Sequence, residues 1–187
     1  MKCKNMLISI SIAIGIAVLA SGAAFSADQD KYSAKVPGGL ALSEFRGYET
    51  WQVISVSHSG EMLAAILGNP AMIEAFKAGI PDNGKPFPDG AKMVKIHWNA
   101  KKNEASPGQP TVPASQHDVD VMAKDSKRFA DSAGWGYGYF LYDAASKSFT
   151  PATLKDMPPQ GNDAKCGSAC HTAAQKRDSV FTEFPTR

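Results

Sequence analysis

The sequence predicts an α+β fold, in which a predominantly antiparallel β-sheet is accompanied by a few short helices and a distinct C-terminal segment. Two observations support this prediction. Short apolar or alternating segments recur along the chain, and turn residues separate them, as is typical of strands. The 187 residues also include 16 glycines and 12 prolines, which favour short strands and turns over a helix bundle.

The first elements follow from local signals. Residues 27–46 predict an irregular lead-in, and residues 48–56 and 62–67 predict strands. Residues 71–78 predict a helix, because Pro70 suits the first helical turn and a glycine follows the last residue.

The later elements are expected to be mostly strands. Residues 92–98 alternate as in a half-buried strand, and residues 118–123 and 135–142 predict two more. Between the strands predicted at residues 92–98 and 118–123, residues 99–113 are polar and contain three prolines, which predicts an exposed loop. Residues 180–184 close the chain.

The N-terminus resembles a secretory signal peptide, expected to cover residues 1–26. Lys2 and Lys4 supply positive charge, residues 6–19 form an apolar stretch, and small residues follow it. The alternative is an uncleaved anchor, although the apolar stretch is short for a membrane span. A lipoprotein is excluded because Cys3 precedes the apolar stretch. We therefore expect a periplasmic protein.

Residues 27–187 are long enough for one compact domain with a core of its own. The formal net charge of the chain is +2, and the two signal lysines account for it. The mature domain is thus close to neutral, which argues against nucleic acid or an anionic membrane as its partner.

Cys166, Cys170 and His171 form the sharpest motif in the chain. Covalent c-type haem needs two thiols for its vinyl groups and an adjacent imidazole for its iron; the usual spacing is C-x-x-C-H. Here three small residues separate the cysteines. A disulfide, a zinc site and a redox dithiol are the alternatives, and none explains the histidine and the export signal together. We predict a C-terminal haem-attachment segment with His171 as the iron ligand.

The sixth coordination position of the iron separates the classes of haem protein. Electron-transfer cytochromes commonly place a methionine there. No methionine follows the motif, and Met157 precedes it too closely, so a five-coordinate iron that binds small molecules is expected. Four other methionines remain alternative ligands: Met62, Met72, Met93 and Met122.

The chain resembles the cytochrome P-460 family over most of the mature domain. The resemblance is carried by an ordered series of short segments: Tyr48-Glu49-Thr50-Trp51, Asn69-Pro70, Pro88-Asp89-Gly90 followed by Lys95, residues 121–129, Gly134-Trp135-Gly136-Tyr137, Cys170-His171 and Val180-Phe181-Thr182. The cysteine spacing is one residue longer than the family's, and residues 62–67 are more aliphatic than in its hydroxylamine oxidisers.

The resemblance implies specific chemistry. Members of the family oxidise hydroxylamine and link a lysine to the porphyrin, which corresponds to Lys95 here; the distal carboxylate that accepts protons corresponds to Asp120. A related group, cytochrome c′-beta, lacks the link and binds nitric oxide. The resemblance thus implies a haem oxidoreductase with a soluble cytochrome as redox partner and a homodimeric assembly. A gas-binding protein and an electron-transfer cytochrome are the alternatives.

Other aromatic and histidine side chains are expected to be structural. Trp135, Tyr137 and Tyr139 share one strand face and could wall a haem, but core packing is the favoured interpretation, and the intervening glycines let a flat group approach the other face. The remaining histidines, His58, His97 and His117, have no clustered partners in the sequence.

Overall fold

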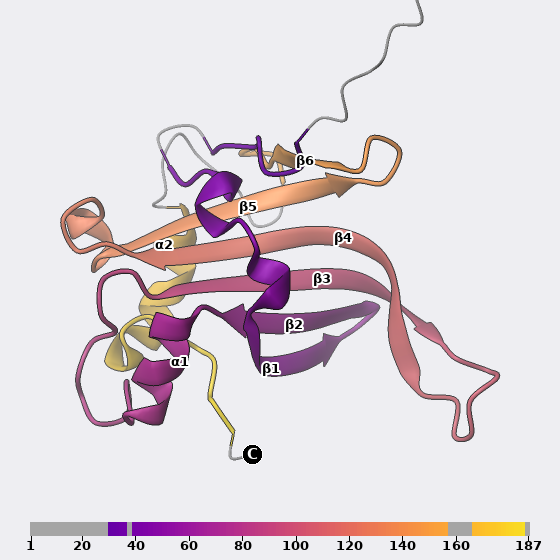
Figure 1. Ribbon diagram of the computed structural model, residues 1–187, viewed down its shortest axis with the longest axis horizontal. Helices are drawn as coiled ribbons and strands as arrows, with labels where there is room; N and C mark the ends of the chain where they lie inside the picture. Colours follow the sequence, from indigo (N-terminus) through magenta and orange to yellow (C-terminus); the bar gives the residue numbers. More distant parts are fainter. Residues whose placement is uncertain (1–29, 37–38, 157–165, 186–187) are drawn as a thin grey trace, which may run out of the picture.

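The computed structural model describes residues 30–36, 39–156 and 166–185 (Figure 1). The predicted signal peptide therefore lies outside the described residues. In chain order the elements are η1 (Leu42–Phe45), η2 (Tyr48–Thr50), β1 (Gln52–Ser59), β2 (Met62–Gly68), α1 (Pro70–Lys77), β3 (Lys92–Lys102), β4 (Thr111–Lys124), η3 (Ala130–Ser132), β5 (Trp135–Asp143), β6 (Ser148–Pro151), α2 (Cys166–His171) and η4 (Thr172–Arg177). No helix of the described ranges has the length and apolar character needed to cross a membrane.

One six-stranded sheet forms the body of the molecule. Its strand order is β1-β2-β3-β4-β5-β6, and every neighbouring pair is antiparallel. Strands that follow one another in the chain thus lie side by side, as Figure 1 shows. The α+β class is confirmed.

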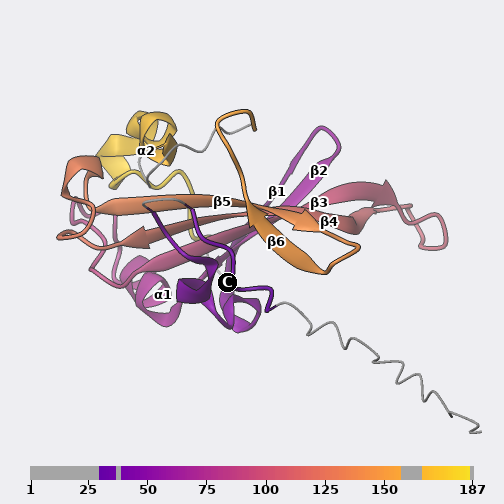
Figure 2. The same cartoon turned by 90° about the horizontal axis from the view of Figure 1, so that it is seen from above.

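The sheet separates two hydrophobic clusters. Figure 2 shows α2 on one side of the sheet and the short N-terminal helices, in indigo, on the other. The N-terminal segment packs on β3 and β4 through residues such as Phe45, Val94 and Val119, all with no exposed surface. A second cluster joins α1 to Met93, Met122 and neighbouring residues. Because side chains alternate along a strand, successive residues of β3 and β4 serve different faces.

Two predicted elements are confirmed closely. The strand over residues 62–67 is β2, and the predicted helix is α1. Its N-terminus is capped by Asn69, whose side chain accepts a hydrogen bond from the Met72 backbone N–H at 3.0 Å. Pro70 occupies the first turn, where the missing N–H would have no helical partner.

The predicted strand over residues 48–56 is wrong at its start. Gly47 adopts a left-handed conformation with φ of 82°, and Tyr48–Thr50 form the 3-10 helix η2, so β1 begins only at Gln52. The Thr50 hydroxyl donates to the Gly47 carbonyl at 2.9 Å and closes this turn. The side-chain pattern alone did not reveal it.

The predicted loop over residues 99–113 is shorter than expected, because strands enter it from both ends. β3 continues to Lys102 and β4 begins at Thr111, which leaves only residues 103–110 between them. Pro113 pairs with Ala100, directly beside a shift in the register between β3 and β4. Strand β6 was not expected. The sequence also predicts a linker at residues 158–161, which lies outside the described residues.

Gly136 shows why β5 carries glycines. A Cβ atom at this position would lie 2.3 Å from the Phe129 ring, on the face opposite Tyr137. The flat group that approaches β5 here is therefore a core phenylalanine.

Substitution of this glycine should destabilise the protein. We expect Gly136→Ala to lower the free energy of unfolding by about 1–3 kcal/mol, the usual cost of overpacking a core. Chemical denaturation measures it. In a Phe129→Leu background the same substitution should cost less, and equal costs in both backgrounds would contradict the steric explanation.

Candidate functional site

A cavity of about 210 Å³ lies between α2 with its following segment and one face of the sheet. Residues from β2, β3, β4 and β5 form one wall, and residues from α2 onward form the other. They are Ile66, Met93, Lys95, Asp120, Val121, Met122, Tyr137, Gly138, Gly167, Cys170, His171, Phe181 and Thr182. The structure thus brings Lys95 and Asp120 together with Cys170 and His171, which lie far along the chain from them.

The His171 imidazole is held in one tautomer. Its Nδ1 lies 2.7 Å from the Ser179 carbonyl oxygen, which can only accept, so Nδ1 carries the proton and Nε2 keeps a free lone pair. The ring is packed between aromatic groups, with centroids 4.8 Å from Tyr137 and 5.1 Å from Phe181. Burial lowers the pKa of His171, which favours the neutral form that binds metals.

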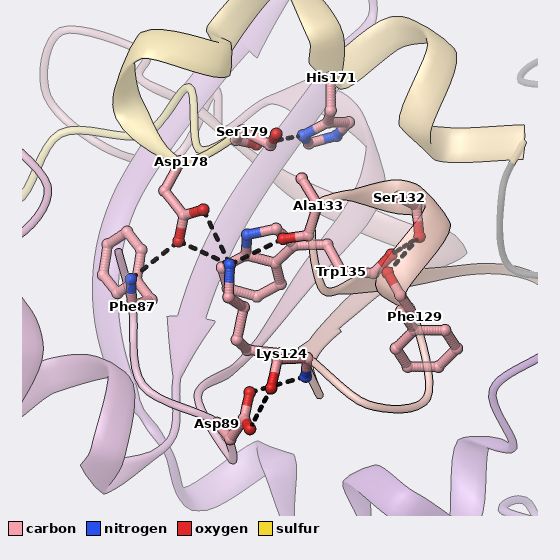
Figure 3. A network of polar contacts seen from close by, with 11 residues as sticks. Phe87, Asp89, Lys124, Phe129, Ser132, Ala133, Trp135, His171, Asp178 and Ser179 are labelled. Atoms are coloured by element: carbon pink, nitrogen blue, oxygen red, sulfur yellow. Dashed lines mark hydrogen bonds and ion pairs between the residues drawn. The ribbon is translucent and has the colours of Figure 1, made fainter. Parts of the chain in front are cut away.

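A buried ion pair anchors the segment that holds His171 (Figure 3). Lys124 Nζ donates to both Asp178 carboxylate oxygens, at 2.8 and 2.9 Å, and to the Ala133 carbonyl at 2.9 Å. The Phe87 backbone N–H donates to the same carboxylate at 2.8 Å. Asp178 directly precedes Ser179, so this network places the carbonyl that orients His171.

Replacement of Lys124 should destabilise the protein strongly. Both members of the pair are well buried, with side chains 6% and 13% exposed, so Lys124→Met leaves the Asp178 charge without its partner. We expect the free energy of unfolding to fall by about 3–5 kcal/mol. Denaturant titration of Lys124→Met beside Lys127→Met, an exposed lysine three residues away, measures it. Equal stability of the two variants would show that the pair does not anchor the segment.

Helix α2 carries the predicted attachment motif and packs closely on β5. A Cβ atom at Gly167 would lie 2.4 Å from the Tyr137 ring, so only glycine permits this approach. Cys170 is a free, exposed cysteine. Cys166 begins the helix, and its side chain lies outside the described residues.

Lys95 and Asp120 face the cavity from neighbouring strands. They are direct partners in the register of β3 and β4. Burial raises the pKa of Asp120 to about 6, and the nearby Asp118 carboxylate acts in the same direction. His97 and Lys95 oppose this shift. The Asp120 side chain is 34% exposed, so this carboxyl group of raised pKa stays accessible, as a proton acceptor in a pocket requires.

A second cavity of about 530 Å³ adjoins the first and shares Lys95 and Asp120 with it. Here His97 and His117, which have no clustered partners in the sequence, have partners in the fold. The Nδ1 atoms of both histidines lie 2.5 Å from oxygens of Asp118, and the Tyr139 hydroxyl donates to Asp118 at 3.2 Å. His97 and Asp118 are 21 positions apart and meet because β3 pairs with β4, so chain spacing gave no signal that His97 joins the cluster.

The aromatic residues of β5 divide between core packing and the wall of the haem cavity. Trp135 is fully buried in the core, as expected, whereas Tyr137 lines the first cavity and packs on His171. Met93 and Met122 also line that cavity, while Met72 is fully buried in the core. Sequence reasoning missed Ser179 and the wall formed by Phe181, because a backbone carbonyl and an irregular segment leave no side-chain pattern.

The residues present fit a haem iron. His171 offers one free imidazole nitrogen at the cavity, oriented by a second hydrogen bond, as iron-ligating histidines are. Ile66, Met93, Met122 and Phe181 supply apolar walls of the kind that a porphyrin contacts.

The family comparison agrees with this geometry. The model of the family described as cytochrome P460 matches residues 45–182, which include the whole sheet and the segment through Thr182. A search of curated proteins found no match to the chain. The resemblance inferred from the sequence is confirmed, and with it haem c and its iron as the cofactor.

Proposed function

We propose that this chain, which belongs to the cytochrome P460 family and therefore carries haem c, is a periplasmic oxidoreductase that oxidises hydroxylamine to nitric or nitrous oxide. The observation that supports this proposal best is the placement of Asp120 and Lys95 in the cavity that His171 borders. When bound, the haem supplies an iron at which a small nitrogenous molecule can be oxidised.

The attachment proposal uses the helical geometry of α2. Residues four positions apart lie on the same face of a helix, and α2 contains Cys166 and Cys170 at this spacing. This accounts for a spacing one residue longer than C-x-x-C-H. His171 directly follows, and its Nε2 provides the proximal ligand.

Asp120 is proposed as the proton acceptor. Oxidation of hydroxylamine releases protons together with electrons, and a carboxylate at the cavity can receive them. Lys95 lies beside it in the register and is the residue proposed to link to the porphyrin edge. The positive charge of Lys95 opposes the rise in the pKa of Asp120 and contributes to the lowered pKa of His171. Lys95 therefore acts on groups on both sides of the cavity.

The proposed partners follow from this chemistry. The electrons would pass to a soluble cytochrome, and the substrate is a small nitrogenous molecule. The near-neutral mature domain gives no reason to expect nucleic acid or membrane partners. A homodimer is proposed on the family relationship.

The test is turnover by haem-loaded protein. The purified holoprotein should reduce an added electron acceptor when hydroxylamine is supplied, and nitric or nitrous oxide should accumulate in proportion. Absence of turnover in protein with full haem content would refute the enzymatic proposal.

One observation favours a second function, the binding of nitric oxide without catalysis. Ile66, Met93 and Met122 give the cavity an apolar lining, which suits a neutral gas better than a polar substrate. The state of Lys95 separates the two functions. A free Lys95 together with tight nitric oxide binding and no turnover would support the gas-binding function.

A further inference from the structure

A cluster of metal-binding groups lies beside the haem cavity, in the part of the sheet face that faces the second cavity. A nitrogen of His97 and carboxylate oxygens of Asp118 and Asp120 all lie within 4.8 Å of one another. The three residues are partners across β3 and β4, where His97 pairs with Asp118 and Lys95 with Asp120. They are therefore held by the most extensively paired strands of the sheet.

We propose that this cluster is a binding site for a divalent cation of the zinc type, distinct from the haem iron. One imidazole and two carboxylates form a ligand set that zinc accepts in tetrahedral sites, with a fourth position left for water or substrate. Two carboxylates this close repel each other, and a cation between them removes that repulsion.

The surroundings of Asp118 are arranged as those of a metal ligand are. Its Oδ1 is hydrogen-bonded directly to His97 Nδ1 at 2.5 Å, and a bound cation would replace the proton of this bond; its other oxygen is bound by His117 Nδ1 at 2.5 Å and by the Tyr139 hydroxyl at 3.2 Å. The side chain is only 4% exposed. Polar groups that bind the remaining oxygen of a ligating carboxylate fix its direction and strengthen metal affinity.

The chemistry also predicts which cations are rejected. Calcium requires six to eight oxygen ligands and magnesium a nearly ideal octahedron, usually with several retained waters. A set of two carboxylates and one imidazole favours zinc and copper over both of these ions. The second cavity, which His97, Asp118 and Asp120 line, gives a cation of this kind access to the cluster.

This inference does not rest on hydroxylamine oxidation. It does connect the two sites, because Asp120 lines both cavities. A cation bound by Asp120 would occupy the carboxylate proposed to accept protons.

The test is zinc binding by the haem-loaded protein, followed by calorimetry, with iron and zinc quantified separately after dialysis. We expect one zinc ion per chain, no binding of magnesium, and affinity at least about tenfold weaker in both His97→Ala and Asp120→Asn. The Asp120→Asn substitution keeps the shape of the side chain, so it guards against loss of folding. Haem content serves as the check that each variant is intact.

The matched control is His58→Ala. His58 is an exposed histidine on β1 and does not belong to the cluster, so its removal should leave zinc binding unchanged. The inference is overturned if the haem-loaded protein binds no stoichiometric zinc. It is equally overturned if His97→Ala and Asp120→Asn bind zinc as the unaltered protein does.

Discussion

Asp120→Asn is expected to lower the turnover of hydroxylamine by about 10²- to 10⁴-fold, the usual contribution of a positioned acid or base. The amide has the same shape as the carboxyl group but cannot accept a proton. Haem content and substrate binding should therefore change little, and the loss should appear in kcat. Steady-state kinetics with an added acceptor, in buffer freed of divalent metals, measures this.

Asp143→Asn is a suitable control for that experiment. Asp143 lies at the end of β5 in the hairpin to β6, where its carboxylate accepts hydrogen bonds from the Ser146 backbone N–H and hydroxyl, and it lines neither cavity. Its substitution should leave turnover unchanged. If Asp120→Asn retained the turnover of Asp143→Asn, the assignment of Asp120 as the proton acceptor would be wrong.

His171→Gly is expected to remove the protein ligand of the iron and to abolish turnover. The substitution leaves a space between Tyr137 and Phe181, whose rings flank the imidazole. Free imidazole fits that space, so added imidazole should restore the optical spectrum of histidine-ligated haem and part of the activity. Absorption spectroscopy before and after imidazole addition follows the change.

His58→Gly provides the comparison, since it removes an exposed histidine from β1. It should keep the native spectrum and show no response to small amounts of imidazole. An unchanged spectrum in His171→Gly would mean that another residue ligates the iron on the proximal side.

The sheet could be predicted from the sequence where the pattern is local. The alternation in residues 92–98 and the capping signals at Asn69-Pro70 each correspond to an observed element. The irregular elements could not be predicted in this way. The extension of β3 to Lys102 and the start of β4 at Thr111 depend on pairing across the hairpin, which outweighs the unfavourable Pro113.

The candidate site was predictable only in part. The motif at Cys166 to His171 is contiguous, and Lys95 and Asp120 were placed by family resemblance. The cluster of His97, Asp118 and His117 depends on strand register, and the orientation of His171 depends on a backbone carbonyl. Neither leaves a pattern in a single sequence. The Lys124–Asp178 pair, 54 positions apart, is of the same kind.

Peptide mass mapping tests the central claim, that haem is attached at Cys166 and Cys170 next to His171. The protein should be matured in a host that attaches c-type haem and then digested with trypsin. We predict that the peptide spanning residues 166–176 carries the haem, and that a linked Lys95 resists cleavage, so that residues 93–101 remain joined to the same haem. A peptide 166–176 without haem, in protein that otherwise contains it, would contradict the account.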